Sequence, residues 1–137
     1  MSTTTRVLAA IALLCANDAQ GHHSFAAFDL SRTWTWEGTV VEFQWVNPHV
    51  HIIVDVPSGA TKTETGGRWN FEGESVTISA RQGWTRKSFA SGDKITVVGH
   101  PAKTGDHEAM LKYAVTGSGV VLYHSIDRDI TPENVPK

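Results

Sequence analysis

Two consecutive stretches in the first half of the chain, 36–46 and 49–56, alternate between apolar and polar residues. In the first stretch the apolar side of the alternation is formed by Val41, Phe43 and Trp45. In the second it is formed by Val50, Ile52, Val54 and Val56. Side chains two apart on a strand point to the same face, so each stretch predicts a β-strand. The Asn47-Pro48 dipeptide between them predicts a turn, and hence an antiparallel pair.

Shorter alternating runs continue along the chain and predict further strands at 68–72, 94–100, 109–116 and 119–124. Ser75 and Gly83 bracket a segment that predicts one short helix, with Ser75 as its N-cap and Gly83 closing it in a left-handed conformation. Five or six short strands, with one helix between the third and fourth, are typical of a small OB-like barrel. The predicted fold class is therefore all-β, or mostly β with one short helix.

The first 21 residues have the pattern of a secretory signal peptide. Arg6 precedes the apolar run 7–16, which is too short to span a bilayer. Small residues at 19 and 21 predict cleavage after Gly21, so that His22 becomes the mature N-terminus. We therefore expect a periplasmic or secreted bacterial protein. Its barrel domain would span 22–126, with a flexible tail at 127–137.

The net charge and the cysteine content exclude some classes of function and of site. The formal net charge of −2 offers no polybasic face for nucleic acid. The single cysteine, Cys15, lies within the predicted signal peptide, so the mature chain would have no disulfide and no thiolate ligand. Lipidation of Cys15 is a minor alternative, because bulky Leu14 stands where lipoprotein sites have a small residue. No second apolar run is long enough for a transmembrane segment.

Histidines are the main candidate metal ligands. His49 and His51 fall on one face of a predicted strand, about 6–7 Å apart along it. Cleavage after Gly21 would give His22 both an α-amino group and an imidazole, and His23 follows it. Amine and imidazole nitrogens suit Cu(II), Ni(II) or Zn(II), whereas Met110 as the only mature thioether makes Cu(I) a poorer fit. The alternative is that these histidines are ordinary surface residues, with Asp55 bonded to one ring.

Two other functions remain open. Trp36 and Trp84, with His49, could line a groove for an aromatic, quinone or sugar ligand, although tryptophans in phase with strand patterns are more typical of a core. A small lyase, hydratase or isomerase could use a His/Asp pair in a barrel pocket. The sequence contains no nucleophile elbow, phosphate loop or HExxH run, so we lean towards a protein that is not an enzyme. His107 and His124 lie in or beside predicted loops and receive no role.

Several short motifs occur together in the mature chain, namely His22–Phe25, Glu37–Val40, Trp45–His49, Arg81–Thr85 and Gly92–Val97. With the signal peptide, this arrangement resembles the DUF6152 family of small exported bacterial proteins, from His22 to about Thr116. That family has no assigned activity. The resemblance implies a periplasmic barrel.

The sequence therefore predicts a periplasmic, non-catalytic binding or accessory protein. The sharpest hypothesis is a divalent metal site, copper(II) first, formed by His22, His23, His49 and His51. A small-molecule ligand or a periplasmic protein partner is the alternative occupant.

Overall fold

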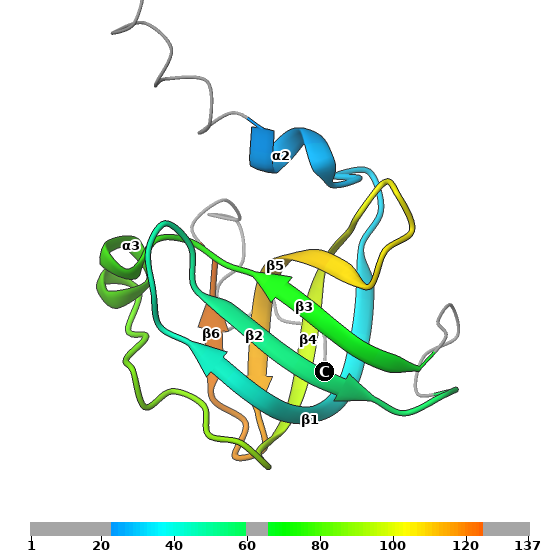
Figure 1. Ribbon diagram of the computed structural model, residues 1–137. Coiled ribbons are helices and arrows are strands. Elements are labelled where there is room, and N and C mark those ends of the chain that lie inside the picture. The colour runs from blue at the N-terminus through cyan, green and yellow to red at the C-terminus, as the bar shows by residue number, and fades with distance from the viewer. Residues whose placement is uncertain (1–22, 60–65, 125–137) are drawn as a thin grey trace, which may run out of the picture.

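Residues 23–59 and 66–124 are described by a computed structural model, and they form a β-barrel (Figure 1). The predicted signal peptide, Cys15, His22 and the predicted tail at 127–137 lie outside these residues. Within the described part of the chain, no helix is long and apolar enough to cross a membrane.

The barrel is built from the strands β1 (Trp34–Gln44), β2 (His51–Val56), β3 (Gly67–Glu72), β4 (Lys94–Pro101), β5 (Glu108–Thr116) and β6 (Val121–Tyr123). Their order in the sheet is β3-β2-β1-β4-β5-β6, and β3 also pairs with β5. That last pairing is parallel and closes β1 to β5 into a barrel, while β6 extends the sheet from β5. Together with the helix between β3 and β4, this order confirms the OB-like barrel.

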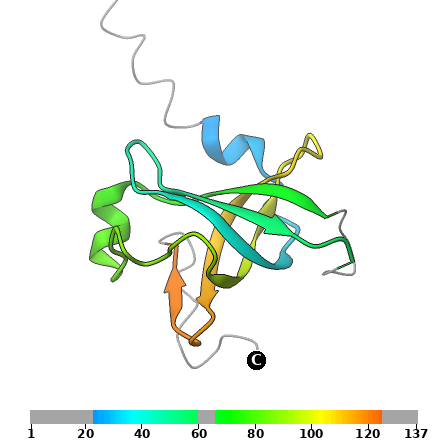
Figure 2. The same cartoon turned by 60° about the horizontal axis from the view of Figure 1, so that its bottom comes forward.

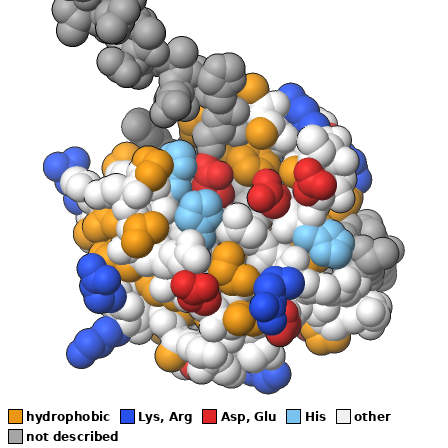
Figure 3. Space-filling model, in the orientation of Figure 1, with side chains coloured by type: hydrophobic (Ala, Val, Ile, Leu, Met, Phe, Trp, Pro, Cys, Tyr) orange, Lys and Arg blue, Asp and Glu red, His pale blue; other side chains and the backbone are white. Residues whose placement is uncertain are grey.

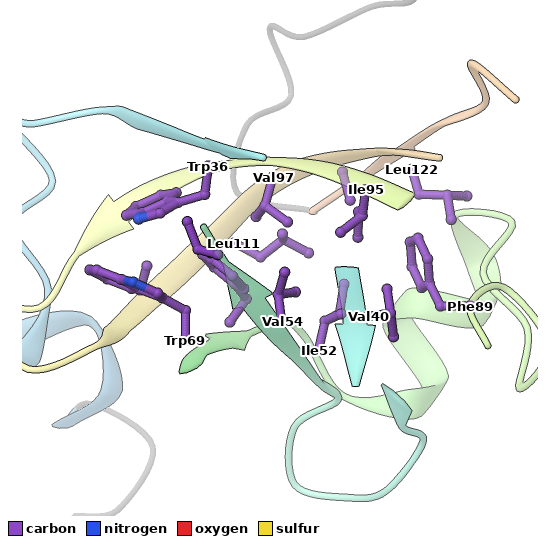
Figure 4. Packing of buried hydrophobic residues seen from close by; sticks show 14 of the residues in the cluster. Trp36, Val40, Ile52, Val54, Trp69, Phe89, Ile95, Val97, Leu111 and Leu122 are labelled. Atoms are coloured by element: carbon purple, nitrogen blue, oxygen red, sulfur yellow. The ribbon is translucent and has the colours of Figure 1, made fainter. Parts of the chain in front are cut away.

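The barrel interior contains the alternating apolar side chains. Val50, Ile52, Val54 and Val56 of the β2 region are between 0% and 4% exposed, which confirms the face predicted for them. Trp36 and Trp69 lie next to each other at one end of this core, with ring centroids 5.0 Å apart (Figure 4). The aliphatic side chains fill the middle, and Phe89 lies at the other end.

The face predicted for β1 is wrong at one position. A β-bulge between Val40 and Glu42 inserts Val41 as an extra residue opposite β2. Val40 is therefore the buried residue, at 1% exposure, and Val41 is only half-buried. After the bulge Phe43 pairs with Ile52 and packs against the core, as the alternation predicts.

The short helix predicted near Ser75 is confirmed as α3 (Val76–Arg81). The Ser75 hydroxyl accepts a hydrogen bond from the Ile78 backbone N–H at 3.3 Å, which satisfies one of the unpaired donors of the first turn. Gly83 follows the helix with φ +90°, a conformation that favours glycine.

A short N-terminal helix, α2 (His23–Ala27), was not predicted. The chain after it is tied to β4 by a β-bridge between Phe28 and Ala102 and by a hydrogen bond from Lys103 N–H to the Ala27 carbonyl. Phe28 packs with Ala102 and Met110 in a small cluster separate from the main core. In two views α2 lies over the end of the barrel where the β1–β2 connection also lies (Figures 1 and 2).

Candidate functional site

Most of the candidate functional side chains lie on the outer face of β2 and β3. The two strands are antiparallel, with His51 opposite Glu72 and Asp55 opposite Arg68. Residues at alternate positions point away from the core, so β2 and β3 present polar side chains to each other across the strand pair. Figure 3 shows histidine side chains beside acidic side chains on this face.

His49 lies just before β2 and is hydrogen-bonded to Glu72 of β3. Its Nδ1 is 2.9 Å from the Glu72 Oε1, and the two side chains are 35% and 21% exposed. A carboxylate only accepts hydrogen bonds, so Nδ1 carries the proton and donates it. The second ring nitrogen, Nε2, then keeps its lone pair whenever the ring is neutral.

The His51 ring is also held through its Nδ1, but by a different acceptor. Its Nδ1 is 3.0 Å from the side-chain oxygen of Asn70, which lies two residues from Glu72 on β3. An amide oxygen also only accepts, so Nδ1 again carries the proton. His49 and His51 therefore present Nε2 as the nitrogen that can bind a ligand or a metal ion.

Asp55 does not bond a histidine ring. Its carboxylate receives two hydrogen bonds from the guanidinium of Arg68, at 3.0 and 3.2 Å. These bonds hold the pKa of Asp55 below its usual value. A His/Asp pair, which the enzyme hypothesis required, is thus replaced on this face by the His49–Glu72 pair.

A second histidine–glutamate pair, which the sequence does not predict, is formed by His124 and Glu74. His124 follows β6 and is only 5% exposed, with Nε2 3.8 Å from the Glu74 Oε1. Burial lowers the pKa of His124, although the charge of Glu74 opposes this. Its Nδ1 has no hydrogen-bond partner among residues 23–59 and 66–124. No local sequence pattern indicates this pair, because His124 and Glu74 come together only in the folded sheet.

The other predicted site residues lie apart from this face. Trp36 and Trp84 are 0% and 3% exposed in the main core, and the Trp84 indole N–H donates to the Tyr123 carbonyl at 2.9 Å. The structure therefore does not gather them with His49 around a groove. His23 begins α2, but its side chain is not described, and His22 lies outside the described residues.

Across 23–59 and 66–124, no group of three or more His, Cys, Asp or Glu side chains could hold one ion. A metal ion at His49 and His51 would therefore need further ligands from outside these two side chains. The orientation of both rings fits that use, because acceptors hold Nδ1 and leave Nε2 to coordinate.

Comparison with known proteins finds one family. The family model described as "Family of unknown function (DUF6152)" matches residues 10–111. No curated protein and no solved structure matches the chain.

Proposed function

We propose a metal-binding function for this chain, which belongs to the DUF6152 family of unknown function. The protein would be a non-catalytic accessory protein that binds a divalent transition metal, copper(II) first, on the outer face of β2. The observation that carries this proposal is that His49 and His51 both have Nδ1 bonded to an acceptor on β3.

Metal-binding histidines in proteins are held in this way. The ring nitrogen that does not touch the metal donates to a carboxylate, a carbonyl or water, which fixes the tautomer and the ring orientation. Glu72 supplies a carboxylate to His49, and Asn70 supplies an amide oxygen to His51. Imidazole nitrogens with no thiolate nearby suit Cu(II), Ni(II) and Zn(II).

The remaining ligands would come from the N-terminal arm. If the chain is exported and cleaved after Gly21, the α-amino group and imidazole of His22 could chelate the same ion, and His23 could join them. The position of α2 supports this, because the chain after it packs on Met110, which pairs with Glu72 across β3 and β5. Export to the periplasm is part of the proposal.

Native mass spectrometry of protein exported from its own signal, with and without Cu(II), tests the proposal. A chain that starts at His22 should gain one copper ion. His22→Ala and the double variant His49→Phe/His51→Phe should each lose it. His107→Gln is the matched control, because the His107 ring stacks on Trp69 and is not one of the proposed ligands, and it should still bind copper.

Two results would refute parts of the proposal separately. A wild-type chain that takes up no Cu(II) would remove the metal function altogether. A chain that starts elsewhere but binds copper through His49 and His51 would remove only the role of His22.

The His49–Glu72 pair also supports a second candidate function. An imidazole that donates from Nδ1 to a carboxylate and presents Nε2 is oriented as a general base. The chain could then be a small lyase, hydratase or isomerase. Turnover of such a substrate in the presence of a metal chelator, abolished by His49→Gln, would favour this reading over metal binding.

A further inference from the structure

A third histidine, His100 on β4, lies directly opposite Met110 on β5. From this pair we infer a second copper position, which would take Cu(I) and would be distinct from the Cu(II) position proposed at His49 and His51. The inference uses other strands and other ligands, so it does not depend on the first site.

Both side chains point away from the core. A register shift between Val98 and Gly99 places Gly99 opposite Leu111, whose side chain faces the core at 1% exposure. The next pair along, His100 and Met110, must therefore face outward. Met110 accordingly belongs to the separate cluster with Phe28. Directly opposite residues on an antiparallel pair have Cβ atoms about 4.5–5.5 Å apart, close enough for both side chains to reach one ion.

The ring of His100 is held in the same way as those of His49 and His51. Its Nδ1 is 2.7 Å from the backbone carbonyl oxygen of Arg32. A carbonyl only accepts, so Nδ1 donates and Nε2 keeps the lone pair needed for coordination. The acceptor belongs to the segment between α2 and β1, which also covers Met110 through Phe28.

Met110 supplies a soft ligand. The chain has two methionines, Met1 and Met110, and Met1 lies in the predicted signal peptide. A thioether selects Cu(I) over the harder divalent ions, and an imidazole accepts either oxidation state. The Met110 side chain is 3% exposed, so a metal ion would reach its sulfur only when the covering side chain moves.

Phe28 is that cover. It is 4% exposed and packs on Met110 and Ala102. Its backbone is held to the end of β4 by the bridge to Ala102 and by the hydrogen bond from Asp29 N–H to the Pro101 carbonyl at 2.9 Å. Metal access would require the Phe28 ring to turn away while these backbone bonds remain, which would open the sulfur to an incoming ion.

The test uses the full chain and Cu(I) kept reduced with ascorbate, in competition with a chromogenic Cu(I) chelator. The wild type should retain one Cu(I), and X-ray absorption should show one sulfur neighbour. Met110→Leu keeps the volume of the side chain and should lose both the sulfur neighbour and the retained Cu(I). Phe28→Ala should load faster, and His49→Phe/His51→Phe should retain Cu(I) like the wild type.

The inference is overturned if Met110→Leu retains Cu(I) unchanged, or if the bound Cu(I) has only nitrogen neighbours. It is also overturned if Cu(I) disappears with His49 and His51, because the ion would then sit at the first position. Should Met110→Leu fail to fold, His100→Gln serves instead. His100→Gln should lose the retained Cu(I). Retention of Cu(I) by this variant as in the wild type would contradict the inference.

Discussion

His49 and His51 differ in the acceptor that each Nδ1 meets. Glu72 is a carboxylate, whereas Asn70 is a neutral amide. A carboxylate partner makes the ring a stronger electron donor to a metal, because it stabilises the positive charge that develops on the ring. His49 is therefore expected to be the stronger of the two ligands.

Glu72→Gln is expected to weaken Cu(II) binding by about 10- to 100-fold, as measured by competition titration. The matched control is Asp55→Asn, which removes a negative charge from the same face but breaks only the ion pair with Arg68. The control should bind Cu(II) with unchanged affinity. An equal loss in both variants would mean that the charge of the face, rather than the orientation of His49, sets the affinity.

His124 is expected to make the free energy of unfolding depend on pH. Burial lowers its pKa, so the native protein resists protonation more than the unfolded chain does. Below about pH 6.5, the ordinary pKa of histidine, the unfolded chain binds a proton that the native protein lacks. The free energy of unfolding should therefore fall as the pH falls below that value.

Denaturant unfolding between pH 7 and 5 measures this effect in His124→Phe, which keeps an aromatic ring at the site. As the pH falls, the free energy of unfolding should fall more in the wild type than in His124→Phe. His100→Gln retains His124 and should follow the wild type. A variant with the same pH slope as the wild type would show that His124 does not carry the effect.

The sequence predicts which histidines share a face but not what their rings touch. Alternation in 49–56 is enough to place His49 and His51 together, because the period of a strand is two. The acceptors come from β3, and the register of β3 against β2 decides that Glu72 and Asn70, rather than Asp55, meet the rings. His124 could not be assigned, because its partner is 50 residues away along the chain and is reached only through β6.

At the scale of elements, β1 depends on a close approach at Gly38. β1 pairs with β4 through its first half and with β2 through its second, and Gly38 lies near the change. A Cβ atom at Gly38 would overlap the backbone oxygen of Asp55 on β2. Only glycine fits there without moving a strand.

Gly38→Ala is therefore expected to lower the free energy of unfolding by about 1–3 kcal/mol, the usual cost of overpacking. Chemical denaturation monitored by tryptophan fluorescence measures the change. Gly117→Ala is the matched control, because a Cβ there meets Lys94 only at ordinary contact distances of 3.4 and 3.6 Å. Equal stability of the Gly38 variant and the wild type would contradict the packing argument.

The cap of α3 gives a second test at this scale. Ser75→Ala removes the acceptor for the Ile78 N–H and should cost about 1 kcal/mol of stability. Thr77→Ala, at an exposed position of the same helix, removes a hydroxyl without removing the cap. It should leave the thermal midpoint unchanged or slightly raised, and an equal loss in both variants would rule out the cap as the cause.

The elements were easier to predict than their exceptions. Strand alternation and the Ser75 and Gly83 signals are local, so β2 and α3 could be found from the sequence. The bulge at Val41 could not, because two successive valines suit either face and only pairing with β2 chooses between them. α2 has five residues and lacks a charge pattern that would mark its ends, which explains why it was missed.

At the scale of the whole molecule, one parallel pairing closes the barrel. β3 and β5 pair over Asn70–Glu72 and Glu108–Met110, which brings segments far apart in sequence together. The barrel could be predicted from the order of strands and helix, whereas this contact and the seating of Phe28 on Met110 depend on the closed fold. The same closure places His49 and His51 on one side of Met110 and His100 on the other.

We propose that His49 and His51 hold a transition metal through Nε2 while acceptors on β3 hold Nδ1. Long-range proton–nitrogen NMR of the imidazole rings, before and after one equivalent of Zn(II) as a diamagnetic probe, tests it most directly. The metal-free protein should show Nδ1–H tautomers for both rings, and Zn(II) should shift the Nε2 signals of both. Nε2–H tautomers in the metal-free protein, or Zn(II) shifts that leave His49 and His51 unchanged, would contradict this proposal.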